Sequence, residues 1–129
     1  MKISIIASLV ILAASNQSAA AEWKLIGEEE PGIQFFIDPE TLIKGPRPRA
    51  WILADRQQPD SDGWSSINAL MEANCDEGKI RFVSTRAYSE RMATGKQLQQ
   101  QDADQIVWEY SEPGTVFGLI FDAICTNNQ

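Results

Sequence analysis

The chain has 129 residues, the size of one domain with a modest hydrophobic core. Its 18 acidic side chains outnumber 11 basic ones, and the net charge of −7 disfavours nucleic acid and anionic membrane surfaces as partners. Histidine is absent, which removes the usual general base and the commonest metal ligand. We therefore expect a protein that is not an enzyme, binds no metal and uses no cofactor.

The amino terminus has the pattern of a secretory signal peptide over residues 1–21. Lys2 precedes an apolar run from Ile3 to Ala14, and the small residues at 18–21 allow cleavage there. The run is too short to span a bilayer, so we expect no membrane anchor after cleavage. No cysteine stands directly after the cleavage site, where a lipoprotein would be acylated, so we expect a protein that is not a lipoprotein. Residues 22–129 then form a single domain, periplasmic or secreted.

The only two cysteines, Cys75 and Cys125, lie in the exported part, where oxidising conditions allow disulfides to persist. A reactive thiolate needs a histidine or a strongly basic neighbourhood, and neither is obvious in this sequence. We expect one structural disulfide between them. Closing a loop of about fifty residues stabilises a fold by about 4 kcal/mol in the chain-entropy model.

The first half of the domain is predicted to form short strands joined by turns. Residues 23–27 are typical of a strand, and apolar residues alternate with polar ones over 33–37. We expect residues 38–41 to end this second strand as a turn. The segment 50–54 is apolar on both faces, as in a central strand. Residues 45–49 contain two prolines and are predicted to connect into it.

The longest two-residue alternation of the chain runs over residues 67–75 and predicts a hairpin with the strand that begins at Lys79. Pairing Cys75 with Lys79 would put the lysine on the buried face, so the pairing of the two strands must be offset by one residue. A bulge at Gly78 or a four-residue loop would supply it. This register places Cys75 on the core face beside Ile80.

The last part of the chain ends in a predicted helix. Residues 89–105 are polar and fit either a long mobile loop or an edge strand, and 106–110 are typical of a strand. Thr115 is a candidate cap for a helix over 116–124. The broad apolar face of this helix holds Phe117, Ile120, Phe121 and Ile124. The expected fold class is α+β, with about five to six antiparallel strands packed on a single C-terminal helix and the disulfide tying helix to sheet.

Several short motifs occur in an order that is similar to a known family. They are Glu22 to Gly27, Phe35 to Pro39, Trp51 to Asp55, Asn74-Cys75, Met92 to Gly95, and Cys125. Together they resemble the bacterial surface-adhesin protein E family over nearly the whole exported chain. The resemblance implies a sheet curved around a disulfide-tied helix, a homodimer, and adhesion to host extracellular-matrix or plasma proteins such as vitronectin and laminin.

The leading functional interpretation is an exported, non-catalytic module that binds a protein partner. An alternative is a periplasmic inhibitor or chaperone-like factor that binds a bacterial or host enzyme. The candidate binding residues are Arg47 and Arg49, which prolines restrain, and Trp64. For at least two of the other three tryptophans we expect packing in the core; these are Trp23, Trp51 and Trp108.

Overall fold

The computed structural model describes residues 21–129, so the predicted signal peptide lies outside the described residues except for Ala21. The strands are β1 (Lys24–Glu29), β2 (Ile33–Ile43), β3 (Arg49–Arg56), β4 (Ser66–Asn74), β5 (Lys79–Tyr88), β6 (Gln97–Asp102) and β7 (Glu109–Tyr110). A single helix of the described chain, α1 (Val116–Asn127), follows them.

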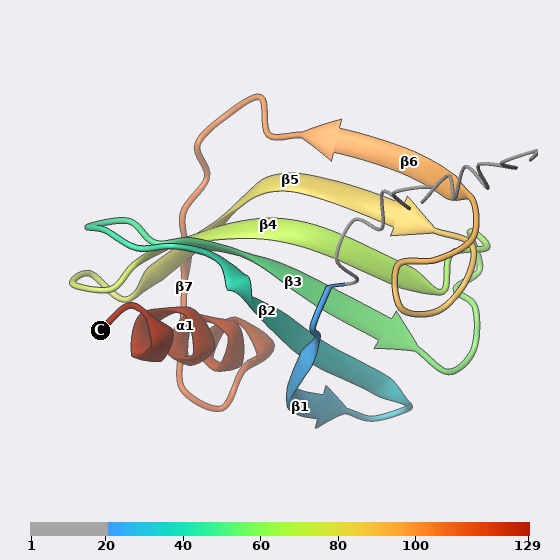
Figure 1. The fold of residues 1–129 in the computed structure, drawn as a ribbon, viewed down its shortest axis with the longest axis horizontal. Helices are drawn as coiled ribbons and strands as arrows, with labels where there is room; N and C mark the ends of the chain where they lie inside the picture. The colour runs from blue at the N-terminus through green and yellow to red at the C-terminus, as the bar shows by residue number, and fades with distance from the viewer. Residues whose placement is uncertain (1–20) are drawn as a thin grey trace, which may run out of the picture.

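Strands β1 to β6 form one antiparallel meander in which each strand pairs with the next (Figure 1). The two-residue strand β7 pairs with the start of β5, on the same edge that β6 occupies further along. Strand β3 has a hydrogen-bonded neighbour on each side, which confirms the prediction of a central strand at 50–54.

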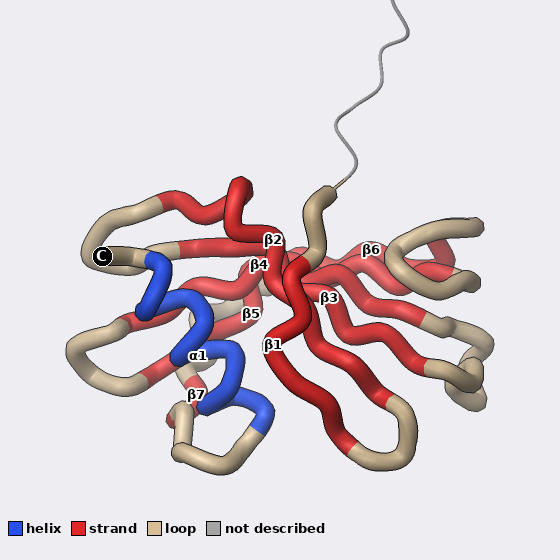
Figure 2. Tube along the Cα trace, turned by 60° about the horizontal axis from the view of Figure 1, so that its bottom comes forward, coloured by secondary structure: helices blue, strands red, loops and turns tan. Residues whose placement is uncertain are grey.

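Helix α1 lies across one face of this sheet and contacts β1 to β5 and β7 (Figure 2). Alternate residues of the strands point toward it and, with the inner face of the helix, form the core. Burying each large aliphatic side chain of this core stabilises the fold by about 1.5–3 kcal/mol. The most deeply buried of them are Ile37, Ile52, Met71, Ile80, Ile120 and Ile124.

A disulfide joins Cys75, directly after β4, to Cys125 in the last turns of α1, with the two Cα atoms 5.8 Å apart. It fastens the end of the helix to the hairpin of β4 and β5. The predicted pairing, the antiparallel sheet and the C-terminal helix are all confirmed, and the protein has the expected α+β fold.

The helix begins where the sequence predicts. The Thr115 hydroxyl oxygen accepts a hydrogen bond from the Gly118 amide at 3.1 Å, which caps the first turn. A Cβ at Gly118 would lie 2.3 Å from the carbonyl oxygen of Glu112, so this position admits only glycine without movement of the turn. The helix extends three residues past the predicted end, to Asn127.

The prediction that residues 38–41 end the second strand is wrong, because β2 continues to Ile43. Pairing with β3 is interrupted after Asp38 and resumes between Ile43 and Arg49. Within the interruption, the Thr41 hydroxyl donates to the Asp38 carbonyl at 2.7 Å. The strand therefore accommodates its proline in an irregularity of the pairing instead of ending at it.

The hairpin between β4 and β5 has the four-residue loop that was one of the two predicted solutions, since Asn74 pairs with Lys79. Ile80 pairs with Ala73, so its predicted place beside Cys75 is wrong by two residues. A shift of two preserves the face on which each side chain lies, which is why the core was still predicted correctly.

The polar segment 89–105 contains the edge strand β6, so the edge-strand alternative holds for Gln97–Asp102. The strand predicted over 106–110 is mostly loop, since only Glu109 and Tyr110 pair with β5. Ile106 and Val107 remain 64% and 57% exposed. These two apolar side chains therefore do not pack in the core.

Candidate functional site

The sheet face opposite α1 carries a row of charges across its centre. Arg49 on β3 pairs with Glu72 on β4, and Glu72 pairs with Arg81 on β5. The next residues along, Ala73 and Ile80, point into the core beneath α1. Because successive side chains of a strand point to opposite faces, the charged row points away from the helix.

A single buried carboxylate holds the two arginines of this row. The Glu72 side chain is 3% exposed, and its Oε2 accepts hydrogen bonds from Arg49 Nε at 2.7 Å and Arg81 Nη2 at 3.0 Å. Burial raises the pKa of Glu72, but the hydrogen bond and charge of Arg81, together with Arg49, outweigh burial and lower it. Glu72 is therefore ionised at neutral pH and fixes both guanidinium groups in place.

Two tryptophan rings lie against arginines on this face. The Cζ atoms of Arg47 and Arg81 each lie 5.6 Å from the ring centroid of Trp108. The Cζ of Arg86 lies 4.9 Å from that of Trp51. All three distances are within the range of cation–π attraction. We call this surface the arginine face and define it by Arg47, Arg49, Arg81, Arg86, Trp51 and Trp108.

The arginine face contains polar groups that the fold leaves unbonded. Across residues 21–129, the buried side-chain polar atoms without a partner are Asn68 Oδ1, Arg81 Nε and Arg86 Nε. Asn68 pairs directly with Arg86, so all three atoms belong to this face. An unmade hydrogen bond of a buried group costs about 1–3 kcal/mol. These two donors and one acceptor lie inside the face, where almost none of their area is exposed to solvent.

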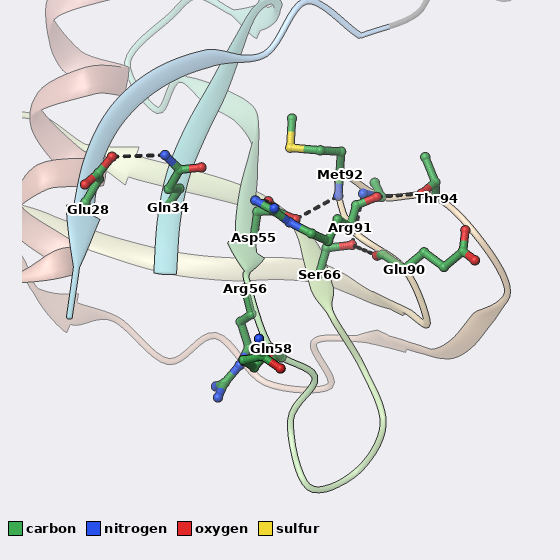
Figure 3. A network of polar contacts seen from close by, with 11 residues as sticks. Glu28, Gln34, Asp55, Arg56, Gln58, Ser66, Glu90, Arg91, Met92 and Thr94 are labelled. Atoms are coloured by element: carbon green, nitrogen blue, oxygen red, sulfur yellow. Dashed lines mark hydrogen bonds and ion pairs between the residues drawn. The ribbon is translucent and has the colours of Figure 1, made fainter. Parts of the chain in front are cut away.

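A second buried carboxylate fixes the loop between β5 and β6 (Figure 3). Asp55 accepts hydrogen bonds from Arg91 Nε at 2.9 Å, Arg91 Nη2 at 2.6 Å and the Met92 amide at 2.8 Å. The Ser66 hydroxyl oxygen accepts from the Ala93 amide at 2.9 Å. These bonds hold Met92 and Ala93 at positive φ values of 57° and 56°, which are uncommon for such residues. This cluster positions the loop and the start of β6.

Of the three candidate binding residues, the structure brings Arg47 and Arg49 to the arginine face and places Trp64 elsewhere. Trp64 lines a hollow of about 400 Å³ on the helix side of the sheet, with Arg56 Cζ 5.2 Å from its ring centroid. Arg47 is exposed, whereas Arg49 is bound to Glu72. Replacing Arg47 therefore tests binding without breaking an ion pair with Glu72.

Sequence reasoning did not single out Arg81, Arg86 or Trp108 as site residues. The alternation of β5 shows Arg81 on the polar side. The register between β4 and β5 then shifts, because Met71 pairs with Phe82 whereas Leu70 pairs with Ser84. That irregularity moves Arg86 onto the same face as Arg81, which strict alternation would not do. The pairing of Trp108 with two arginines joins segments that only the fold brings together.

The expectation that at least two of Trp23, Trp51 and Trp108 pack in the core is wrong. Each of them is half-buried, and none belongs to the core cluster. Trp51 and Trp108 instead support the arginine face. Their rings lie against the guanidinium groups of Arg47, Arg81 and Arg86.

Within residues 21–129 no cysteine, aspartate or glutamate side chains gather in a group of three or more that could hold a metal ion. No helix of that same stretch is long and apolar enough to cross a membrane.

The fold and the site define a small α+β domain in which a disulfide ties one helix to an antiparallel meander, with a charged face on the opposite side. This chain belongs to the surface-adhesin protein E family, whose profile matches residues 23–126. The family resemblance in the sequence is thus confirmed. A surface-adhesin family fits an exported or surface protein that is not an enzyme.

Solved structures support the same fold. The structure of crystal form II of Haemophilus influenzae protein E matches 73% of this chain and 81% of its own chain, with a TM-score of 0.54 and 16% sequence identity. At that identity the similarity concerns the fold alone. No curated protein sequence matches this chain.

Proposed function

We propose that this protein is an exported adhesin that binds host extracellular-matrix or plasma proteins through the arginine face. The observation that carries the proposal is the gathering of four arginines and two tryptophans on the sheet face opposite α1, where Arg47 is exposed and the Arg49 side chain is 40% exposed. Membership of a surface-adhesin family supports the same function. Because a fold alone does not define activity, the proposal depends on this site.

The chemistry of the face suits protein recognition. Arginine and tryptophan are the residues most enriched at binding hot spots. Stacking on Trp51 and Trp108 restrains Arg86, Arg81 and Arg47, so less conformational entropy is lost when a partner binds.

Binding to immobilised vitronectin and laminin tests this proposal. The double variant R47Q/R86Q removes two charges while leaving the Glu72 ion pairs intact. We expect it to bind at least about tenfold more weakly than the wild type, since a hydrogen bond to a charged group contributes about 1.5–3 kcal/mol. Arg56→Gln is the matched control, because Arg56 also stacks on a tryptophan but lies outside the face. Equal binding by wild type and R47Q/R86Q would contradict the proposal.

Cell fractionation tests the location that adhesion requires. An adhesin must be found on the outer surface or outside the cell, and we expect surface labelling of intact cells to reach it. Recovery from the periplasm alone would contradict adhesion. It would favour the inhibitor or chaperone-like alternative.

A homodimer belongs to the same proposal. Every residue of β6 is exposed, and among the described residues no strand pairs with its outer side. Free strand edges are common sites of pairing between chains. Light scattering at increasing concentration should reach the mass of two chains. A monomer mass throughout would contradict this part of the proposal.

A further inference from the structure

Helix α1 leaves part of its own side of the sheet uncovered. The helix contacts β1 to β5 and β7 but not β6 (Figure 1). Thr85 on β5 pairs with Ala69 on β4 and with Gln101 on β6. Ala69 belongs to the core beneath α1, and directly paired residues point to the same side of a sheet. The helix side of the sheet therefore continues past the core onto β5 and β6.

Two neighbouring hollows lie on this uncovered part. One has a volume of about 360 Å³ and the other about 400 Å³, and both are lined by Phe82, Thr85 and Gln101. Three large apolar side chains in them are exposed, Phe82 to 42%, Leu98 to 43% and Val107 to 57%. Exposed apolar side chains that gather in a hollow are typical of a surface that binds a partner. We call this surface the apolar groove and define it by Phe82, Thr85, Leu98, Gln101 and Val107.

The rim of the apolar groove is acidic. Asp62, Asp104 and Glu109 line the two hollows, and none of the three forms an ion pair within residues 21–129. Of the described residues that line the hollows, Arg86 alone is basic. Its guanidinium group lies against Trp51 on the arginine face. The groove therefore favours a partner that carries positive charge beside an apolar surface.

A helix fits this part of the sheet. The same side already packs one helix, since the rings of Phe82 and Phe117 on α1 meet edge to face with their centroids 5.9 Å apart. The stretch of β5 from Phe82 to Ala87 extends about 17 Å, the length of about eleven residues of α-helix. A helix of about three turns is therefore long enough to lie over both hollows. Its apolar stripe would meet Phe82, Leu98 and Val107, as in other complexes of a helix with a groove.

We propose that the apolar groove binds a basic amphipathic helix of a protein partner. The groove lies on the other side of the sheet from the arginine face, so this inference goes beyond the proposed function. Charge complementarity selects the occupant, because the chain has a net charge of −7 and attracts basic segments. Arg56, beside Trp64 at one end of the groove, is already paired with Asp60, with 3.6 Å between their side chains.

Fluorescence anisotropy with two labelled peptides of about 14 residues and equal leucine and lysine content tests the inference. In the first peptide the leucines recur at helical spacing and form one face of a helix. In the second, leucine and lysine alternate, which is the pattern of an amphipathic strand. We expect the first to bind the wild-type protein about tenfold more tightly than the second, and its helix content by circular dichroism to rise on binding.

Paired variants locate the binding. L98S/V107S should weaken binding of the helical peptide about tenfold, whereas Ile43→Ser should not, because Ile43 is 66% exposed but lies outside the groove. D104N/E109Q should also weaken binding, most strongly at low salt. E28Q/E29Q is its control, because it removes two exposed charges from the turn between β1 and β2. Circular dichroism of each variant confirms that it is folded.

Each remaining outcome has a defined meaning. Equal affinity for the two peptides, or wild-type binding by L98S/V107S, would overturn the inference. A mass that rises to two chains and is returned to one by L98S/V107S, without peptide binding, would assign the groove to a second copy and overturn it as well. R47Q/R86Q should bind the helical peptide like the wild type. This result would support the inference even if the arginine face binds neither vitronectin nor laminin, whereas weaker binding by R47Q/R86Q would place the peptide on the wrong side of the sheet.

Discussion

Replacing Glu72 with glutamine removes the carboxylate that holds Arg49 and Arg81. The Glu72 side chain is 3% exposed and that of Arg81 12%, whereas that of Arg49 is 40% exposed. Removing one partner of a buried ion pair costs about 3–5 kcal/mol, and an exposed pair adds at most about 1 kcal/mol. We therefore expect Glu72→Gln to lower the free energy of unfolding by about 3 kcal/mol at neutral pH.

The pH dependence of this difference has a definite sign. The folded-state pKa of Glu72 is lowered, while in the unfolded chain a glutamate titrates near its ordinary value of about 4.3. The stability from the ionised carboxylate is therefore fully present above that value and is lost as pH falls through the folded-state pKa. The difference between wild type and Glu72→Gln should be constant near neutral pH and shrink in acid.

Urea unfolding followed by circular dichroism, repeated from neutral to acidic pH, measures this difference. Glu28→Gln is the control, because Glu28 is exposed and accepts a hydrogen bond only from the Gln34 amide, at 2.9 Å. It should unfold like the wild type. A loss for Glu72→Gln below about 1 kcal/mol, or a loss that stays the same in acid, would refute the ion-pair reasoning.

Three further variants test other parts of the fold. The double variant C75A/C125A should lose about 4 kcal/mol of unfolding free energy, because it lacks the disulfide. Thiol labelling of the wild type, denatured without reductant, should find no free thiol. Labelling of two cysteines would contradict the disulfide. Gly118→Ala should lower stability by about 1–3 kcal/mol, because its Cβ meets the carbonyl of Glu112, and an unchanged melting temperature would count against this packing. Asp55→Asn should speed amide exchange in the loop 89–96 more than in β4, and equal exchange in wild type and variant would show that the carboxylate does not hold the loop.

Local patterns predicted the elements that bury one regular face. The alternation of β4 and the apolar face of α1 follow from burial against the same core, so their residues were predicted together with the disulfide that joins them. The cap at Thr115 was also predictable, because its hydrogen bond to Gly118 is local.

Features that depend on pairing between distant residues escaped prediction. Strand β2 passes through Pro39 because the bonds of Asp38 and Thr41 accommodate the irregularity. Strand β6 was predicted only as one of two alternatives, because all its residues are exposed and it therefore has no apolar alternation.

The candidate site was predicted only in part for the same reason. Arg47 and Arg49 were found through their flanking prolines, which are local signals. Arg81 and Arg86 join them only through the register of β4 and β5, and Trp108 only through the course of the chain back to β5.

The central claim, that a partner binds at the arginine face, is tested most directly by nuclear magnetic resonance of arginine Nε–H and tryptophan indole N–H groups. Spectra of the nitrogen-15-labelled protein are recorded while vitronectin is added. The account predicts that the signals of Arg81, Arg86, Trp51 and Trp108 shift or broaden first, because a partner on this face changes the surroundings of the stacked arginines and tryptophans. Changes confined to Arg56 and Trp64, on the other side of the sheet, would contradict it.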